Sequence, residues 1–319
     1  MPALNMDFNM NMDFNMNMTS PASSVGGNGT RVRFNTEDFR KYLAVNPVTG
    51  VITDPIIPPA NVANMRFPAY WDAELRAYEY LNEFLEAYTN PGLAPGQRTW
   101  EERLTSDVGT VNGPANLTSP HTMAAPALIA EVTQMLDRAP DRPDRFNEII
   151  SQHNGEGAIG YYLGMLMIDP NRMPAVNLLI RVARRIGEHI SMCLKGRFRC
   201  PRPSQLCSAI VPMIDPPATP SFPSGHSLQA QLIARCLLSA APPMQPAHLV
   251  TDLAARIGEN RIIAGLHYPQ DHLIGQQVAD WCFNRLLNGP VARPRYAALV
   301  QAATAQLAML VGGSGADQP

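Results

Sequence analysis

Three separated segments of the chain carry residues of the kinds that bind and transform an oxyanion. They are residues 195–203, 220–227 and 260–271. The first segment ends a basic region, in which seven Lys or Arg residues lie between Arg181 and Arg202 and only Glu188 opposes them. The whole chain has a formal net charge of -2. The positive charge is therefore local, as expected of a binding site for an anion.

Lys195 and Arg202 are the basic residues that we expect to bind this anion. Lys195 ends a predicted helix, where a cation complements the helix dipole. Arg202 lies between two prolines, which stiffen its backbone, and its planar guanidinium suits two-point contact with phosphate-type oxygens. The alternative is a solvated basic helix face. We favour that alternative for the three other arginines on the same helix, Arg181, Arg184 and Arg185.

The second segment contains Pro-Ser-Gly-His at positions 223–226 and enters a predicted helix. Free N–H groups at a helix N-terminus bind anions, and Gly225 lets the backbone approach closely. The Ser224 hydroxyl can donate to an oxygen, and His226 has a side chain that titrates near neutral pH. Taken alone, Ser224 also fits an ordinary helix N-cap.

The third segment places His267 and Asp271 four residues apart, close enough to share one helix face. A carboxylate on one imidazole nitrogen fixes the tautomer and leaves the other nitrogen free as a nucleophile or ligand. Arg261 precedes this pair and can reach the same anion. The alternative is a buried histidine that is hydrogen-bonded to a helix-capping Asp.

Apolar residues at helical spacing predict the elements that must position these segments. The predicted helices cover residues 69–88, 126–136, 144–168, 174–195, 225–240, 247–264, 271–287 and 294–311. Alternating apolar patterns are scarce, and the 30 prolines fall between the helical patterns. We therefore predict an all-α fold of packed helices with long Pro-rich loops, and a site core within residues 174–287.

The two ends of the chain and its composition lead to the remaining expectations, on domain organisation, location and partners. Residues 1–30 contain a tandem NMDFNM repeat and a Gly/Ser-rich stretch, which predict a disordered tail before a single domain at 31–319. No signal peptide is recognised, and no run of about 18 apolar residues occurs. The five Cys lack metal-site spacing. We expect a reduced, cytoplasmic protein with no transmembrane segment, no metal and no nucleic-acid partner. The Met/Phe-rich tail and the apolar helix 294–311 are compatible with a homo-oligomer.

The order of the three motifs resembles a known superfamily. Lys-x6-Arg-Pro, then Pro-Ser-Gly-His, then Arg-x5-His-x3-Asp is similar to the motif set of the type 2 phosphatidic acid phosphatase (PAP2) and vanadium-dependent haloperoxidase superfamily. One position departs from that pattern, because Asn260 stands where the family usually has Ser. The resemblance implies a haloperoxidase/acid-phosphatase-like helical bundle.

The resemblance also implies a role for each site residue. His267 would be the nucleophile that forms a phosphohistidine, Asp271 would orient it, and His226 would be the general acid. Lys195, Arg202, Arg261, Ser224 and the Gly225 amide would hold the phosphoryl oxygens. Phosphoryl transfer depends mostly on positioning and charge stabilisation, which this set supplies without a metal.

Three activities remain open within this superfamily. A phosphatase acting on a small-molecule phosphoester needs no cofactor, whereas a haloperoxidase would hold vanadate in the same pocket, bonded to His267. The His-Tyr-Pro-Gln-Asp sequence at 267–271 resembles the phosphatase form. Thr219 stands where haloperoxidases tend to carry Phe or His, and Met192 stands where they tend to carry Trp. These residues favour the phosphatase. An isoprenoid diphosphate phosphatase or cyclase is a further alternative, with helix 69–88 and loop 89–126 enclosing an apolar tail. A scaffold without activity is disfavoured because every charged site residue is present.

Overall fold

A computed structural model of the chain describes residues 72–86, 125–153, 157–240, 248–288 and 293–312. Within these ranges every regular element is a helix and no strand occurs. The all-α prediction is therefore confirmed. Residues Trp71–Pro319 make one compact unit. The predicted tail, the boundary at residue 31 and most of the predicted loop 89–126 lie outside the described ranges.

The helix boundaries follow the apolar patterns closely. The helices are α3 (Ala73–Glu86), α5 (Ala125–Asp137), α6 (Arg142–His153), α7 (Gly157–Met165), α8 (Pro174–Phe198), α9 (Pro203–Leu206), α10 (Gly225–Ala240), α11 (His248–Ile263), α12 (Pro269–Asn288) and α13 (Pro294–Gly312). A short 3-10 turn, η3 (Ala139–Asp141), precedes α6. Four of these helices begin at a proline, which suits the first helical position because the proline nitrogen has no hydrogen to leave unpaired.

The predicted helical stretch 144–168, in which the glycines could mark a kink, contains two helices, α6 and α7. A Cβ atom on Gly157 would lie 1.8 Å from the carbonyl oxygen of Ser151. The start of α7 therefore packs against the last turn of α6 at a distance that only glycine permits. The four-residue helix α9 was not predicted at all.

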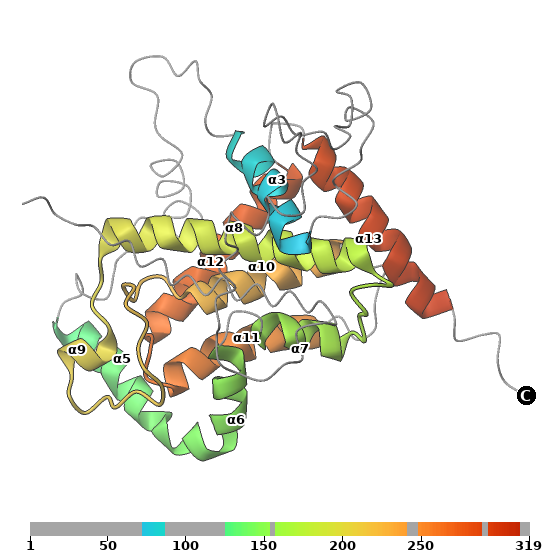
Figure 1. Cartoon of the computed structure of the whole chain (residues 1–319). Helices are drawn as coiled ribbons and strands as arrows, with labels where there is room; N and C mark the ends of the chain where they lie inside the picture. The colour runs from blue at the N-terminus through green and yellow to red at the C-terminus, as the bar shows by residue number, and fades with distance from the viewer. Residues whose placement is uncertain (1–71, 87–124, 154–156, 241–247, 289–292, 313–319) are drawn as a thin grey trace, which may run out of the picture. The chain divides into compact units, whose positions relative to one another are not determined.

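Helix α10 lies at the centre of the bundle, in contact with α8, α11 and α12 (Figure 1). Two glycines bring its neighbours close. A Cβ atom on Gly187 of α8 would lie 2.9 Å from the Leu228 side chain, and one on Gly275 of α12 would lie 2.8 Å from the Ser224 carbonyl oxygen. The middle of α8 and the first half of α12 therefore pack closely against the first turns of α10. The buried apolar stripe of α8 supports this packing through Val176, Leu179, Ala183, Ile186 and Ile190.

The arginines on the first half of α8 bind helix α3. Glu74 of α3 accepts hydrogen bonds from Arg181 (2.5 Å), Arg184 (3.1 Å) and Arg185 (2.9 Å). The Arg185 guanidinium also lies 4.5 Å from the ring centre of Tyr78. The prediction of a solvated basic face is therefore wrong at these three positions, because their charges are partly buried and paired with α3.

Three features of the described residues bear on the wider expectations. In the part of the chain that the structure describes, no helix is both long and apolar enough to cross a bilayer. The five cysteines are free thiols. No group of three or more His, Cys, Asp or Glu residues among the described positions could hold a metal ion.

Candidate active site

The three sequence segments meet at the start of α10. Residues 195–203 complete α8 and lead into α9, residues 220–227 enter α10, and residues 260–271 join α11 to α12. The predicted site residues Lys195, Arg202, Ser224, Arg261, His267 and Asp271 are all buried, while Gly225 and His226 are partly exposed. This burial places several charges in a medium of low polarity, where their mutual effects are strong.

His267 and Asp271 form a direct pair across one turn at the start of α12. His267 Nδ1 lies 3.0 Å from Asp271 Oδ2. The same carboxylate oxygen accepts hydrogen bonds from Ser221 Oγ (2.5 Å) and from the Tyr268 amide (3.1 Å). Burial raises the pKa of Asp271 to about 6, opposed by the hydrogen bond from Ser221 and by the charge of Lys195. The carboxylate that forms above this pKa can only accept, so the proton of this pair resides on His267 Nδ1.

The other nitrogen of His267 faces a cation. Arg202 Nη1 lies 3.2 Å from His267 Nε2. A guanidinium can only donate, so Nε2 must accept and must carry its lone pair. Burial, followed by the charges of Arg202 and Lys195, lowers the pKa of His267 well below its ordinary value. The contacts on both nitrogens thus hold a neutral imidazole with an unprotonated Nε2.

Arg202 is held by backbone carbonyls on either side of the site. Its Nε and Nη2 donate to the Thr219 carbonyl at 3.0 and 2.9 Å, and its Nη1 donates to the Leu266 carbonyl at 3.0 Å. The Thr219 hydroxyl accepts a further bond from Nη2 at 3.2 Å. Arg202 is the N-cap residue of α9, and its amide donates to the Gln205 side chain at 2.7 Å. These hydrogen bonds therefore hold the guanidinium in one orientation.

Lys195 joins the end of α8 to the segment before α10. Its Nζ donates to the carbonyl oxygens of Pro220 and, at 2.9 Å, Ser221. Burial, followed by the charge of Arg202, lowers the pKa of Lys195 to about 7. Because this pKa is close to neutral, the protonation of Lys195 depends on the other charges in the site.

His226 points toward the end of α6. Its Nε2 lies 3.1 Å from the Gln152 carbonyl oxygen. A carbonyl can only accept, so Nε2 carries a proton and Nδ1 is the nitrogen that remains available. Burial, followed by the charge of Arg261, lowers the pKa of His226 to about 3. The Arg261 charge lowers the pKa of both imidazoles, and His226 itself contributes to the shift at His267. The two histidines therefore share one electrostatic environment.

Arg261 has donors that the described residues do not satisfy. It is fully buried, and its Nη2 donates to the Ile149 carbonyl at 3.1 Å. Its Nε and Nη1 have no hydrogen-bond partner among the described residues. Burial lowers its pKa to about 10, so the guanidinium stays charged at neutral pH. A buried cation with unpaired donors is costly, and an anion bound beside it would remove that cost.

Several groups that contact the predicted residues were missed by sequence reasoning. Ser221 was within reach, since it is a hydroxyl residue inside the second motif. The carbonyl oxygens of Ile149 and Gln152 had no sequence signal, because every residue carries a carbonyl whatever its side chain. They show that α6 contributes to the site although it lies outside the three motifs.

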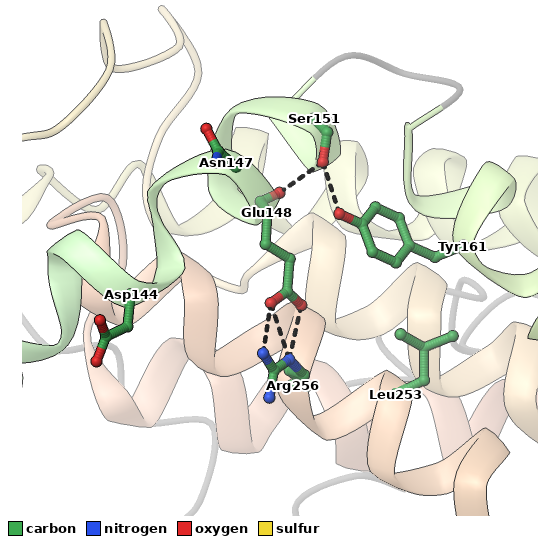
Figure 2. A pocket seen from close by; sticks show the side chains of 7 residues that line it. All are labelled: Asp144, Asn147, Glu148, Ser151, Tyr161, Leu253 and Arg256. Carbon is green, nitrogen blue, oxygen red and sulfur yellow. Dashed lines mark hydrogen bonds and ion pairs between the residues drawn. The ribbon is translucent and has the colours of Figure 1, made fainter.

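An open pocket lies nearby but does not contain the predicted residues. It has a volume of about 590 Å³ and lies between α6, α7 and α11 (Figure 2). Its polar side chains largely satisfy one another: Glu148 accepts two bonds of 2.8 Å from Arg256 Nε, and the hydroxyls of Ser151 and Tyr161 are 2.7 Å apart. The chemistry described above therefore belongs to the buried cluster and not to this pocket.

Comparison with known proteins places the site residues in one family segment. Residues 175–279 match the PAP2 superfamily. This segment runs from α8 into α12 and contains all three motifs, so the resemblance found in the sequence is confirmed. Among solved structures, the chain is similar to the first transmembrane PAP2-type phosphatidylglycerolphosphate phosphatase from Bacillus subtilis, with 16% identity and a TM-score of 0.29 over 70% of this chain and 99% of that chain. The chain has no match among the curated proteins.

Proposed function

From the PAP2 match over residues 175–279 and the geometry at the start of α10, we propose that this chain is a metal-independent phosphatase. Its substrate is a small-molecule phosphoester or diphosphate, and the reaction passes through a phosphohistidine on His267. The observation that carries the proposal is the 3.2 Å contact between His267 Nε2 and Arg202 Nη1. The charge of the buried Arg261 also acts on His267, and two of its nitrogens find no partner among the described residues.

The first step transfers the phosphoryl group to the enzyme. The lone pair on His267 Nε2 forms a bond to phosphorus while the bond from phosphorus to the leaving oxygen breaks. The electron pair of that bond stays with the leaving oxygen, which takes a proton from His226 Nδ1. Lys195, Arg202 and Arg261 stabilise the charge on the phosphoryl oxygens. The Asp271 carboxylate stabilises the positive imidazole that forms.

The second step releases phosphate. A water molecule attacks phosphorus and the bond from phosphorus to Nε2 breaks, which returns the lone pair to His267. The water proton passes to His226, which recovers the form it had at the start. His226 must be protonated to begin a cycle although its pKa is about 3 in the absence of an anion. A bound phosphoryl dianion raises that pKa by direct attraction, so the substrate itself favours the acid form.

The environment of Thr219 favours phosphatase over haloperoxidase. Its hydroxyl accepts a hydrogen bond from Arg202 Nη2 at 3.2 Å, a contact that an aromatic side chain at this position would not make. Vanadate is a tetrahedral oxyanion that fits the same donors, with His267 Nε2 as its protein ligand. When bound it would supply the peroxide-activating centre of a haloperoxidase.

The deciding experiment uses the purified full chain. Hydrolysis of p-nitrophenyl phosphate is measured for the wild type and for His267→Ala, with His248→Ala on the surface of α11 as the control. We expect His267→Ala to lose at least about 1000-fold in kcat and the control to be unchanged. Substrate labelled in the phosphoryl group should leave a label on the wild-type protein that is labile in acid and stable in alkali.

A second assay separates the alternatives. Bromide oxidation is measured after addition of vanadate and hydrogen peroxide, and release of phosphate is measured from a prenyl diphosphate. Oxidation of bromide without phosphoester hydrolysis would contradict the phosphatase. Full hydrolysis by His267→Ala would contradict the assignment of the nucleophile. Hydrolysis of the prenyl diphosphate alone would assign the isoprenoid substrate class.

A further inference from the structure

A chain of hydrogen bonds runs from α12 to the serine at the start of α10. His272 Nδ1 lies 2.9 Å from Ser227 Oγ, and Ser227 Oγ donates to Ser224 Oγ at 2.9 Å. The Ser227 amide lies 3.4 Å from the same Ser224 oxygen. Both serines are fully buried, and His272 is partly buried. His272 directly follows Asp271, but neither its spacing nor the three motifs single it out.

The direction of these bonds restricts each group. A hydroxyl has a single hydrogen, and Ser227 uses it on Ser224. Ser227 can therefore only accept from His272, so His272 Nδ1 must carry a proton. Burial lowers the pKa of His272, which favours the neutral ring with that proton on Nδ1.

Ser224 is left with one free function. Its oxygen accepts from both the amide and the hydroxyl of Ser227, which uses its two lone pairs. No acceptor for its own hydrogen occurs among the described residues. Ser224 lies beside Gly225 at the N-terminus of α10, so this hydrogen is available to an anion bound there.

Gly258 of α11 provides the space for this chain. A Cβ atom at this position would lie 2.1 Å from His272 Nδ1 and 2.8 Å from Ser227 Oγ. Any larger residue would displace the imidazole or the hydroxyl. Three helices therefore meet at this contact: α11 through Gly258, α12 through His272, and α10 through the two serines.

We propose that His272 is a positioning residue for the phosphatase reaction. Through Ser227 it orients the Ser224 hydroxyl as a donor to a phosphoryl oxygen. This inference rests on the proposed function. Without His272, the Ser227 oxygen lacks a donor, and the chain reverses so that Ser224 donates to Ser227. The hydrogen of Ser224 then turns away from the substrate.

The test compares two substitutions of the same residue. His272→Leu removes the donor, whereas His272→Asn keeps an N–H close to the position of Nδ1. The readouts are the inhibition constant for tungstate, kcat/KM for p-nitrophenyl phosphate, and the melting temperature. We expect His272→Leu to raise the inhibition constant roughly tenfold and to lower kcat/KM by at least as much, as for a lost hydrogen bond to a charged group. His272→Asn should recover most of both, and His248→Leu should leave both unchanged.

Two further variants keep the proposal testable if His272→Leu does not fold. Gly258→Ala should produce a similar loss of tungstate binding, because it displaces His272 without removing it. In Ser227→Ala, the additional change His272→Asn or His272→Leu should have no further effect, because the two residues act in one chain.

The possible failures are distinguishable. Unchanged tungstate inhibition in a folded His272→Leu variant of an active enzyme would overturn the role of His272 alone. An equally large loss in His272→Asn would do the same, since it would show that only the ring packing matters. A wild-type protein that neither hydrolyses phosphoesters nor binds tungstate would overturn the proposed function and this inference with it.

Discussion

Two hydrogen bonds of opposite direction control the protonation of His267. Nδ1 donates to a carboxylate that is itself held by Ser221 and the Tyr268 amide, and Nε2 accepts from Arg202. A protonated imidazole would have two donors and would oppose Arg202. The site therefore keeps a nitrogen lone pair next to several cations, which suits attack on an anionic phosphoryl group.

Arg202→Lys should be far from conservative. An ammonium group cannot reproduce the set of bonds that Arg202 makes to Thr219, Leu266 and His267. We expect kcat/KM for p-nitrophenyl phosphate to fall about 100-fold, the usual effect of losing a donor to the developing charge. Arg199→Lys, at an exposed position three residues earlier, is the matched control and should be neutral. A rate within twofold of wild type in Arg202→Lys would show that its geometry is not needed.

Anion binding should weaken as the pH rises. The pKa of Asp271 is about 6 and that of Lys195 about 7 before an anion binds. Loss of either proton makes the site more negative, so the affinity for a dianion must fall through this range, by at most tenfold per pH unit for each proton. Inhibition by tungstate, whose own charge is constant here, measures the effect from pH 6 to pH 9. Lys195→Met should bind more weakly and with a flatter profile, whereas a flat profile in the wild type would contradict the shifted pKa of Lys195.

At the scale of elements, α6 supports the site although it lies outside the three motifs. Arg142 of α6 donates to the Ile263 carbonyl, and Glu148 pairs with Arg256 of α11 (Figure 2). These contacts hold α6 against α11 and the residue that follows the Arg261 turn, and the last turn of α6 provides the carbonyls that bind Arg261 and His226. Glu74 joins a second pair of helices, α3 and α8. This contact lies in the first half of α8, whereas the motif residue Lys195 lies near the end of that helix.

The contacts of the Asn260 side chain explain why this chain has Asn where the family pattern has Ser. Its amide donates to the Gln152 side chain at 2.9 Å and accepts from Arg145 at 3.2 Å, so it joins α11 to α6. We expect Asn260→Ser to cost about 1–3 kcal/mol, because a shorter side chain leaves the buried Gln152 without this partner. Thermal unfolding measures the cost, and kcat/KM should fall several-fold as the α6 carbonyls shift. Asn147→Ala, on the exposed face of α6, should change neither quantity, and an unchanged stability in Asn260→Ser would contradict the joining role.

At the scale of the whole molecule, the bundle buries more positive charge than its own residues neutralise at the start of α10. Lys195, Arg202 and Arg261 are buried there, and Asp271 is the one carboxylate among the predicted site residues. Repulsion and unpaired donors make this region unfavourable until an anion arrives. The stability of the folded unit should therefore depend on oxyanions.

Phosphate or tungstate should raise the melting temperature of the full chain. At a concentration 100 times the Kd, binding to the folded state alone adds about 2.7 kcal/mol. For a unit of this size we expect an increase of roughly 5–10 °C. Chloride at equal ionic strength is the control, and Arg261→Met should lose most of the increase. An equal effect of chloride would show that only general salt effects act on the fold.

The sequence determined those features that depend on local geometry. The apolar stripe of α8 and the four-residue spacing of His267 and Asp271 are properties of neighbouring turns, so this helix and this pair could be predicted from residue types alone. The three motifs likewise identified the cations that meet at α10.

Only the tertiary structure decided the partners that are distant in the chain. Glu74 pairs with three arginines that were expected to face solvent. The Ile149 carbonyl binds Arg261, and the Gln152 carbonyl binds His226. Backbone carbonyls are the same in every residue, so their role depends on how the helices pack, which no spacing along the chain reveals.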